Sequence, residues 1–311
     1  MKSLIIYHAN CNDGFGAAWV AYHALTRLKP LDDIVLYPAT YGQEPPLDLI
    51  DNHTDVYIVD FSYSVEHTKD IAAKAYCTVV LDHHKTAIEN FAGVQEIVNC
   101  RTVFDVTKSG AMLTWDYFHS PAFPTPVPQL VQYIQDRDLW KFELEGTREV
   151  HLNLSTYPQT IAAWDKVSQL LEVGVTRRGF ISEGAAIKRY YDKIVSDIIR
   201  SGKSEFTIDG IVGLVCNAPY VFASDIGNIL AKESETFGAT WYETANNSVV
   251  FSLRSVGDFD VSEIAKKFGG GGHKNAAGFK LGHPTNPFTG NNGITLWSSD
   301  KLDEFAKDPI E

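Results

Sequence analysis

Residues 77–84, CTVVLDHH, carry the pattern that decides the fold of the N-terminal half. The stretch begins with an apolar, β-branched run typical of a buried strand. It ends on three polar side chains, Asp82, His83 and His84. We therefore expect a strand whose carboxyl end carries groups able to bind metal ions or move protons.

Strand patterns alternate with amphipathic helical patterns around this stretch. Further strands are expected at residues 3–8, 55–60 and 94–100. Helices are expected at residues 14–28, 65–75, 109–118 and 127–135. This alternation predicts an α/β fold with a doubly wound, mainly parallel sheet.

Ligands of doubly wound sheets bind beyond the carboxyl ends of the strands. Here two of those ends carry His8 and Asp60, and Asp13 follows in the loop after the first strand. Imidazoles together with carboxylates suit divalent ions such as Mn²⁺. A carboxylate that bridges two ions can hold them ~3.5–4 Å apart. Two more aspartates, Asp136 and Asp138, follow a predicted helix in the run IQDRDLW.

The length of 311 residues suggests about two domains of roughly 150 residues each. Residues 1–177 form the expected α/β domain, and a long helix at residues 178–203 connects it to a second domain. That domain, residues 204–283, has several strand patterns and two helical ones, which predicts a smaller α+β unit. Residues 284–311 have the composition of a loosely packed tail.

Composition narrows the class of protein. No window approaches the ~20 consecutive apolar residues of a membrane span, and the N-terminus lacks a signal-peptide pattern. Four widely spaced cysteines predict reduced thiols and a cytoplasmic location. The 27 basic and 39 acidic residues leave a net charge of −12, which disfavours binding of long nucleic acids by charge alone. A small phosphorylated substrate stays compatible if metal ions supply positive charge.

Residues 269–279, GGGGHKNAAGF, indicate phosphate binding in the second domain. Consecutive glycines let a backbone approach an anion and turn its N–H groups toward it. His273 could donate to a phosphoryl oxygen, and Arg254 could reach the same anion with its guanidinium. A flexible linker is the alternative for the glycines, and a surface ion pair is the alternative for Arg254.

Several of these motifs resemble the DHH phosphoesterase superfamily. The resemblance rests on His8 with Asp13-Gly14, Val59-Asp60, LDHH at 81–84, KSGA at 108–111, and the glycine-rich run, in that order over residues 1–280. Relatives include RecJ-type exonucleases, nano-RNases and dinucleotide phosphodiesterases, and more distantly inorganic pyrophosphatases and exopolyphosphatases. The resemblance implies a metal-binding catalytic domain followed by a substrate-binding domain.

The resemblance also implies roles for individual residues. The metal ligands would be His8, Asp13, Asp60, His83 and Asp136, with Asp138 as the competitor for the last position. Asp60 would bridge two Mn²⁺ ions, for which Mg²⁺ or Co²⁺ are alternatives. His84 would meet the substrate phosphate or a water rather than a metal ion, and Asp82 would support the site from behind. The expected substrate contacts are Arg254, Gly270, Gly271, Gly272 and His273, on the far side of an interdomain cleft.

One position departs from the family pattern. Many relatives carry an aspartate two residues before Asp13, where this chain has Cys11 between Asn10 and Asn12. Either asparagine could offer a neutral oxygen, and Cys11 could offer a thiolate, which would shift the metal preference toward softer ions. Cys11 as a small buried residue is the alternative.

These features predict a metal-dependent phosphodiesterase for short oligonucleotides or dinucleotides. Trp115, Trp140, Tyr220 and Phe222 are candidates for base stacking, with the hydrophobic core as the alternative for each. A hydrolase of polyphosphate and a catalytically weak nucleotide-binding protein are the competing functions. The sequence leaves the oligomeric state open, with a homodimer as one option.

Overall fold

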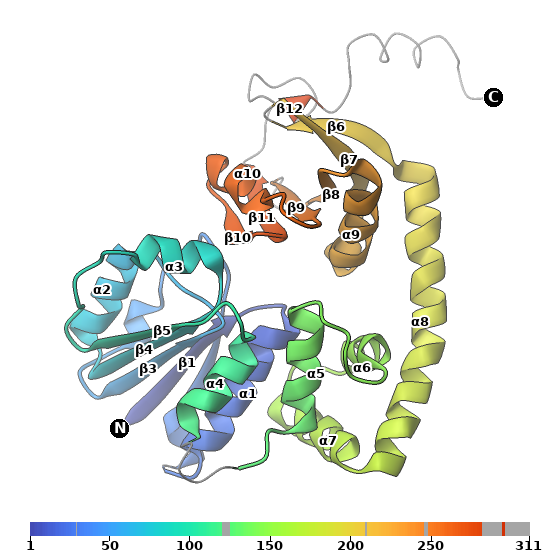
Figure 1. The fold of residues 1–311 in the computed structure, drawn as a ribbon. Coiled ribbons are helices and arrows are strands. Elements are labelled where there is room, and N and C mark those ends of the chain that lie inside the picture. Colours follow the sequence, from blue (N-terminus) through green and yellow to red (C-terminus); the bar gives the residue numbers. More distant parts are fainter. Residues whose placement is uncertain (29, 120–124, 209, 246–247, 282–293, 296–311) are drawn as a thin grey trace. The chain divides into compact units, whose positions relative to one another are not determined.

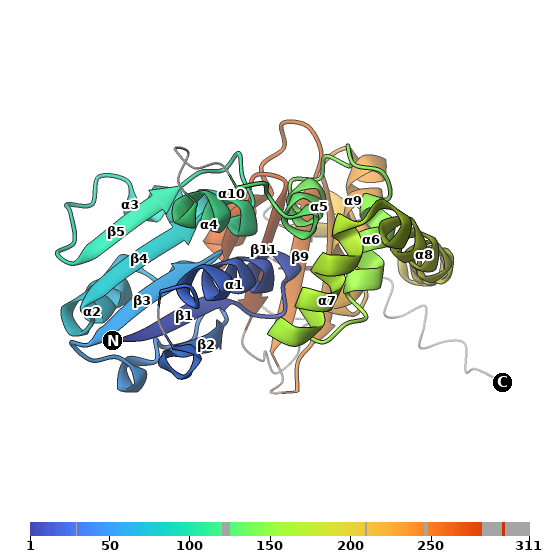
Figure 2. The same cartoon turned by 90° about the horizontal axis from the view of Figure 1, so that it is seen from below.

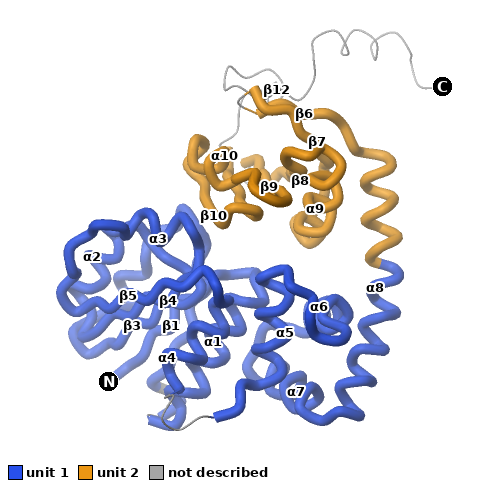
Figure 3. Tube along the Cα trace, viewed as in Figure 1, with its two compact units in different colours: residues 1–190 blue, residues 191–311 orange. Residues whose placement is uncertain are grey.

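The computed structural model describes residues 1–28, 30–119, 125–208, 210–245, 248–281 and 294–295. Residues 1–190 and 191–311 form two compact units (Figures 1 and 3). The first contains a parallel sheet and the second a smaller unit with a mixed sheet. The predicted fold class is confirmed.

The sheet of the first unit has the strand order β2-β1-β3-β4-β5, and all neighbouring strands are parallel. Its strands are β1 Lys2–His8, β2 Ile34–Ala39, β3 Thr54–Val59, β4 Cys77–Asp82 and β5 Cys100–Phe104. Because β1, β3 and β4 are neighbours, their carboxyl ends meet at one edge of the sheet.

Both faces of this sheet are buried, as parallel sheets require. On β1, Ile5 and Tyr7 pack with α1 (Asn12–Leu25) and α4 (Gly110–Phe118), which lie on one face (Figure 2). Leu4 and Ile6 point to a second core that contains Ile71 from α2 (Val65–Lys74). Successive β1 side chains thus serve opposite faces.

The remaining α-helices within residues 1–202 come after β4 in sequence. They are α3 Lys85–Phe91, α5 Gln129–Asp138, α6 Thr147–Leu154, α7 Ile161–Glu172 and α8 Gly174–Gly202. Most of them contribute to the same core as α1 and α4. The long helix α8 occupies the segment expected to connect two domains. The division into compact units falls inside it, so the expected limits at residues 177 and 204 stay a prediction.

Two expectations for the parallel sheet fail at its edges. The strand predicted at residues 94–100 is wrong, because β5 begins only at Cys100 and residues 94–99 lie in a largely exposed loop. The edge strand β2 was not predicted. It begins with a short apolar run, IVLY, but its side chains are mostly half-buried and it contains Pro38.

The second unit has a sheet of order β10-β11-β9-β8-β7-β6-β12, antiparallel except for the pair β7–β8. Its strands are β6 Ser204–Ile208, β7 Ile211–Asn217, β8 Phe237–Glu243, β9 Val249–Ser255, β10 Gly271–His273, β11 Ala276–Leu281 and β12 Ile294–Thr295. Its helices are α9 Ala223–Ser234 and α10 Val261–Lys267.

Apart from β12, the predicted tail at residues 284–311 lies outside the described residues. Among the helices that are described, none is both long and apolar enough to cross a bilayer.

Candidate metal centre

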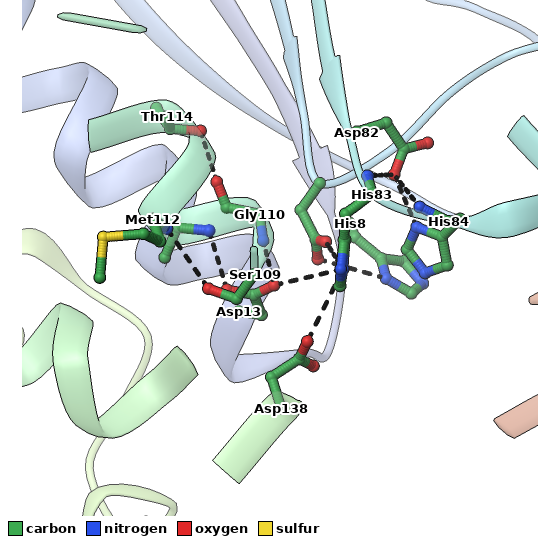
Figure 4. A network of polar contacts seen from close by, with 12 residues as sticks. His8, Asp13, Asp82, His83, His84, Ser109, Gly110, Met112, Thr114 and Asp138 are labelled. Carbon is green, nitrogen blue, oxygen red and sulfur yellow. Dashed lines mark hydrogen bonds and ion pairs between the residues drawn. The ribbon is translucent and has the colours of Figure 1, made fainter. Parts of the chain in front are cut away.

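Most of the side chains predicted to bind metal ions lie close together at the carboxyl edge of the parallel sheet (Figure 4). His8 is the last residue of β1, Asp60 follows β3, and His83 follows β4. Asp60 has a left-handed backbone, φ 53°, and its N–H donates to the carbonyl of Leu81 at 2.9 Å. Aspartate is one of the few residues that tolerate this conformation, which fixes its carboxylate at the end of the strand.

Asp60 lies between two groups of potential ligand atoms. His8 Nδ1 is 3.7 Å from Asp60 Oδ2, and His83 Nε2 is 3.0 Å from Asp60 Oδ1. His83 Nε2 is also 3.5 Å from Asp13 Oδ2 and 3.8 Å from Asp138 Oδ2. The ligand atoms of Asp13, His83 and Asp138 all lie within 4.8 Å of one another, as do those of His8, Cys11 and Asp60. The cluster therefore has the donors for two ions on either side of Asp60.

Asp13 is held in place by the start of α4. Its Oδ2 accepts a hydrogen bond from the N–H of Gly110 at 2.5 Å, and its Oδ1 accepts one from Ala111 at 2.8 Å. Gly110 also lets the helix approach Asp60, because an added Cβ would lie 2.4 Å from Asp60 Cβ. The KSGA run thus positions two carboxylates at once.

Asp82 accepts hydrogen bonds from both histidines that follow it, and its expected supporting role stays a prediction. Its Oδ1 accepts hydrogen bonds from His84 Nδ1 at 2.6 Å and from the backbone N–H groups of His83 and His84. Its Oδ2 accepts one from the Ser62 hydroxyl at 2.5 Å. Asp82 is fully buried, and its hydrogen bonds fix the imidazole of His84 and the backbone of His83.

The structure places Asp138, not Asp136, beside His83. Asp136 turns away and accepts hydrogen bonds from the backbone N–H groups of Glu143 and Leu144 and from the Thr147 hydroxyl. The two aspartates are two residues apart on α5, which rotates them about 200° relative to each other. Asp136 therefore closes the loop after α5, and Asp138 lies where the competing ligand was expected.

Burial and repulsion control the charge of the cluster. Burial raises the pKa of Asp13 well above its usual value, and the carboxylates of Asp60 and Asp138 raise it further. Burial would also raise the pKa of Asp60, but His8 and His83 outweigh burial and hold that pKa below its usual value. Burial lowers the pKa of His83, yet Asp138 and Asp60 outweigh it and leave that pKa well above the usual value. A proton on His83 thus supplies positive charge that a bound cation could supply instead.

The donor set fits divalent ions. Asp60 is 1% exposed, and apart from the ion pair with His83 its Oδ1 accepts no hydrogen bond from the described residues. A buried carboxylate oxygen in this state is costly unless a cation completes its surroundings. Three carboxylates and two imidazoles are also the donor types that Mn²⁺ accepts.

The glycine-rich run of the second unit differs from the expected anion nest. The N–H groups of Gly269 and Gly270 donate to the carbonyls of Lys266 and Ala265, at 3.0 and 2.9 Å, and so end α10. The N–H of Gly270 is therefore already used, and a contact of Gly270 with substrate stays a prediction. Gly271 and Gly272 lie in β10 with His273 and pair with β11.

Arg254 lies in β9 of the same unit. Its guanidinium donates to the backbone carbonyl of Leu253 and to the hydroxyl of Ser224, both at 2.8 Å. The structure thus gives Arg254 local partners in the second unit, and neither alternative for it, the phosphate contact or the surface ion pair, is tested by these bonds.

Of the stacking candidates, Trp115 is 8% exposed and belongs to the core, whereas Tyr220 is 51% exposed. Phe222 packs against Tyr191. Trp140 has a cationic neighbour, because the guanidinium of Arg137 lies over its ring, 4.1 Å from the ring centre.

A second arginine–aromatic pair beside Trp140 was not predicted. Arg148 lies 4.0 Å over the ring of Phe142 and 5.5 Å from that of Trp140. Trp140 and Phe142 both have positive φ, 58° and 55°, which is uncommon for bulky residues and typical of functional sites. Arg148 is eight positions from Trp140 in sequence, and no motif links them.

Comparison with known proteins matches residues 214–289 to the DHHA1 domain. An uncharacterized protein of Acanthamoeba polyphaga mimivirus is 33% identical over 294 residues, which cover 88% of this chain and 66% of that protein. The oligoribonuclease NrnB of Bacillus subtilis is 24% identical over 89% of this chain and 72% of its own length. The chain thus spans about two thirds of the first of these relatives.

Among solved structures, a DHH domain described as a member of a family of ribosomal proteins aligns with a TM-score of 0.63. The alignment covers 90% of this chain and 83% of that one at 16% sequence identity. At this identity the likeness concerns the fold alone.

The two aspartates of α5 provide a matched test of the centre. We expect Asp138→Asn to weaken binding of Mn²⁺, measured by isothermal titration calorimetry, with little change in stability. Asp136→Asn should keep Mn²⁺ affinity but lower the free energy of unfolding by about 1–3 kcal/mol, because buried loop donors lose an acceptor. The reverse pattern would return the ligand role to Asp136.

Proposed function

The chain belongs to the DHH phosphoesterase superfamily, and from that premise we propose that it is a metal-dependent hydrolase of phosphodiester bonds in short oligonucleotides or dinucleotides. The observation that carries the proposal is the cluster around Asp60. It gathers three carboxylates and two imidazoles at the carboxyl edge of a parallel sheet, where ligands of such folds bind.

Five residues of the cluster would hold the metal ions. When bound, divalent ions supply Lewis acidity and a nucleophile at neutral pH. His8, Asp13, Asp60, His83 and Asp138 would hold them. Asp13 and Asp60 are 2% and 1% exposed, so their positions are fixed before substrate arrives.

His84 would act on the substrate rather than on an ion. Asp82 accepts from its Nδ1, which orients the ring and directs Nε2 away from Asp82. Burial lowers the pKa of His84, but Asp82 outweighs it and raises that pKa above the usual value. A protonated His84 could donate to a phosphoryl oxygen and stabilise the charge that develops there.

Two arginine–aromatic pairs within residues 137–148 favour a short nucleic acid as the substrate. Arg137, next to Asp138 in sequence, stacks on Trp140, and Arg148 stacks on Phe142. Such a group offers both positive charge for a phosphate and flat surfaces for a base. A net charge of −12 disfavours long duplexes, and the relative named oligoribonuclease acts, by its name, on short RNA.

In the second unit, Arg254, Gly271, Gly272 and His273 would contact the substrate phosphate. We do not include Gly270 among these contacts, because its N–H donates to the carbonyl of Ala265 at the end of α10. The interdomain cleft stays a prediction. We also propose a cytoplasmic location, because all four cysteines are free thiols.

Product analysis with Mn²⁺ tests this function. The full chain should release mononucleotides from a short oligoribonucleotide or a linear dinucleotide. Asp60→Asn should lower kcat by more than about 100-fold, because even groups that only orient ligands contribute 10–100-fold. The control Asp70→Asn changes an exposed acid of α2 and should keep full activity. Phosphate release from polyphosphate alone would favour the phosphoanhydride hydrolase, and undiminished turnover by Asp60→Asn would contradict the metal centre.

The substrate-binding role of the second unit has its own test. His273→Ala should raise KM by roughly tenfold or more, because a hydrogen bond to a charged group contributes about 1.5–3 kcal/mol. Its Mn²⁺ affinity should not change. His53→Ala, which truncates an exposed imidazole, should leave both quantities unaltered. An unchanged KM for His273→Ala would remove His273 from the site.

A further inference from the structure

The side chain of Cys11 faces the cluster instead of capping its own helix. Cys11 is the N-cap residue of α1, and its side chain makes no capping hydrogen bond. Serine, threonine, aspartate or asparagine normally fill this position and accept one from the helix. The sulfur of Cys11 instead lies within 4.8 Å of a ligand atom of His8 and one of Asp60.

Asn12, the residue after Cys11, does not compete with it for this position. The amide of Asn12 donates to the Ser155 hydroxyl at 3.3 Å and lies 3.5 Å from His151 Nδ1, so it points toward α6. Asn10 has a left-handed backbone, φ 57°. The sulfur of Cys11 is thus directed at His8 and Asp60, whereas the amide of Asn12 is directed at Ser155.

Asp60, the carboxylate that faces both His8 and His83, also has the surroundings of a cation ligand. Asp60 is 1% exposed, and apart from the ion pair with His83 its Oδ1 accepts no hydrogen bond from the described residues. Its other oxygen, Oδ2, is 3.7 Å from His8 Nδ1. A buried carboxylate in this state, beside an imidazole and a thiol, has the surroundings of a cation ligand rather than of a structural carboxylate.

We propose that Cys11 is a sulfur ligand of the ion held by His8 and Asp60, so that this position selects Zn²⁺ or Co²⁺ over Mn²⁺. Thiolate and imidazole favour these softer ions. As the sulfur–metal bond forms, the S–H bond breaks and its proton leaves to water. The other position, with Asp13, His83 and Asp138, offers mainly oxygen and suits Mn²⁺. This inference rests on the metal centre of the proposed function, but not on its substrate.

Titration of the full-length metal-free protein with Co²⁺, followed by absorption spectroscopy, tests this assignment. A Cys–Co²⁺ bond adds an intense charge-transfer band in the near ultraviolet to the weaker visible bands of bound Co²⁺. We expect this band in the wild-type protein. Cys11→Ser and Cys11→Asp should lose it, and Cys11→Asp should still bind Mn²⁺ at this position. Cys77→Ser, at the opposite end of β4 from Asp82, should keep the band.

The outcomes separate this inference from the proposed function. Visible Co²⁺ bands without the charge-transfer band, or a band that survives in both Cys11 variants, would overturn sulfur ligation and leave the metal centre intact. Failure of the wild-type protein to bind Co²⁺, Zn²⁺ or Mn²⁺ at all would overturn both. Circular dichroism verifies that each variant folds, and Cys11→Asp decides the question if Cys11→Ser does not fold.

Discussion

Repulsion between buried carboxylates is the constraint on which the candidate centre depends. Asp13 and Asp60 are almost fully buried, and Asp138 joins them around one nitrogen of His83. Carboxylates this close cannot all keep their charge without a compensating cation. In the metal-free chain, protonation meets part of this need, as the raised pKa values of Asp13 and His83 indicate. Divalent ions would meet it more completely, and their binding would release those protons.

The fold holds these charges together by short backbone connections. Neighbouring parallel strands bring His8, Asp60 and His83 to one edge, and two glycines allow the closest approaches. A Cβ on Gly14 would lie 2.2 Å from the carbonyl oxygen of His8, and one on Gly110 would overlap Asp60. The N–H groups of α4 then stabilise Asp13 without adding a competing cationic side chain. The main chain thus determines most of the geometry of the centre. It places carboxylate oxygens of Asp13, Asp60 and Asp138 around His83 Nε2.

Sequence reasoning located the parts of the site that follow from strand periodicity. His8, Asp60 and Asp82 were predicted because buried strands have a clear pattern and their ends are easy to find. The choice between Asp136 and Asp138 could not be made, since it depends on which face of α5 meets the sheet. The edge strand β2 was missed although it begins with the apolar run IVLY. The start of β5 was placed too early because Val94, Ile97 and Val98 are apolar residues of the preceding loop. The use of the Gly270 N–H at the end of α10 could not be predicted, because a glycine that ends a helix and a glycine in an anion nest look alike in sequence.

Anomalous diffraction tests the central claim most directly. Crystals of the full-length protein would be soaked in excess Mn²⁺ and data collected at the manganese absorption edge. The account predicts two anomalous peaks that flank the Asp60 carboxylate, one beside His8 and the other beside Asp13, His83 and Asp138. Peaks that are absent from this cluster, or present only at other places on the protein, would contradict it.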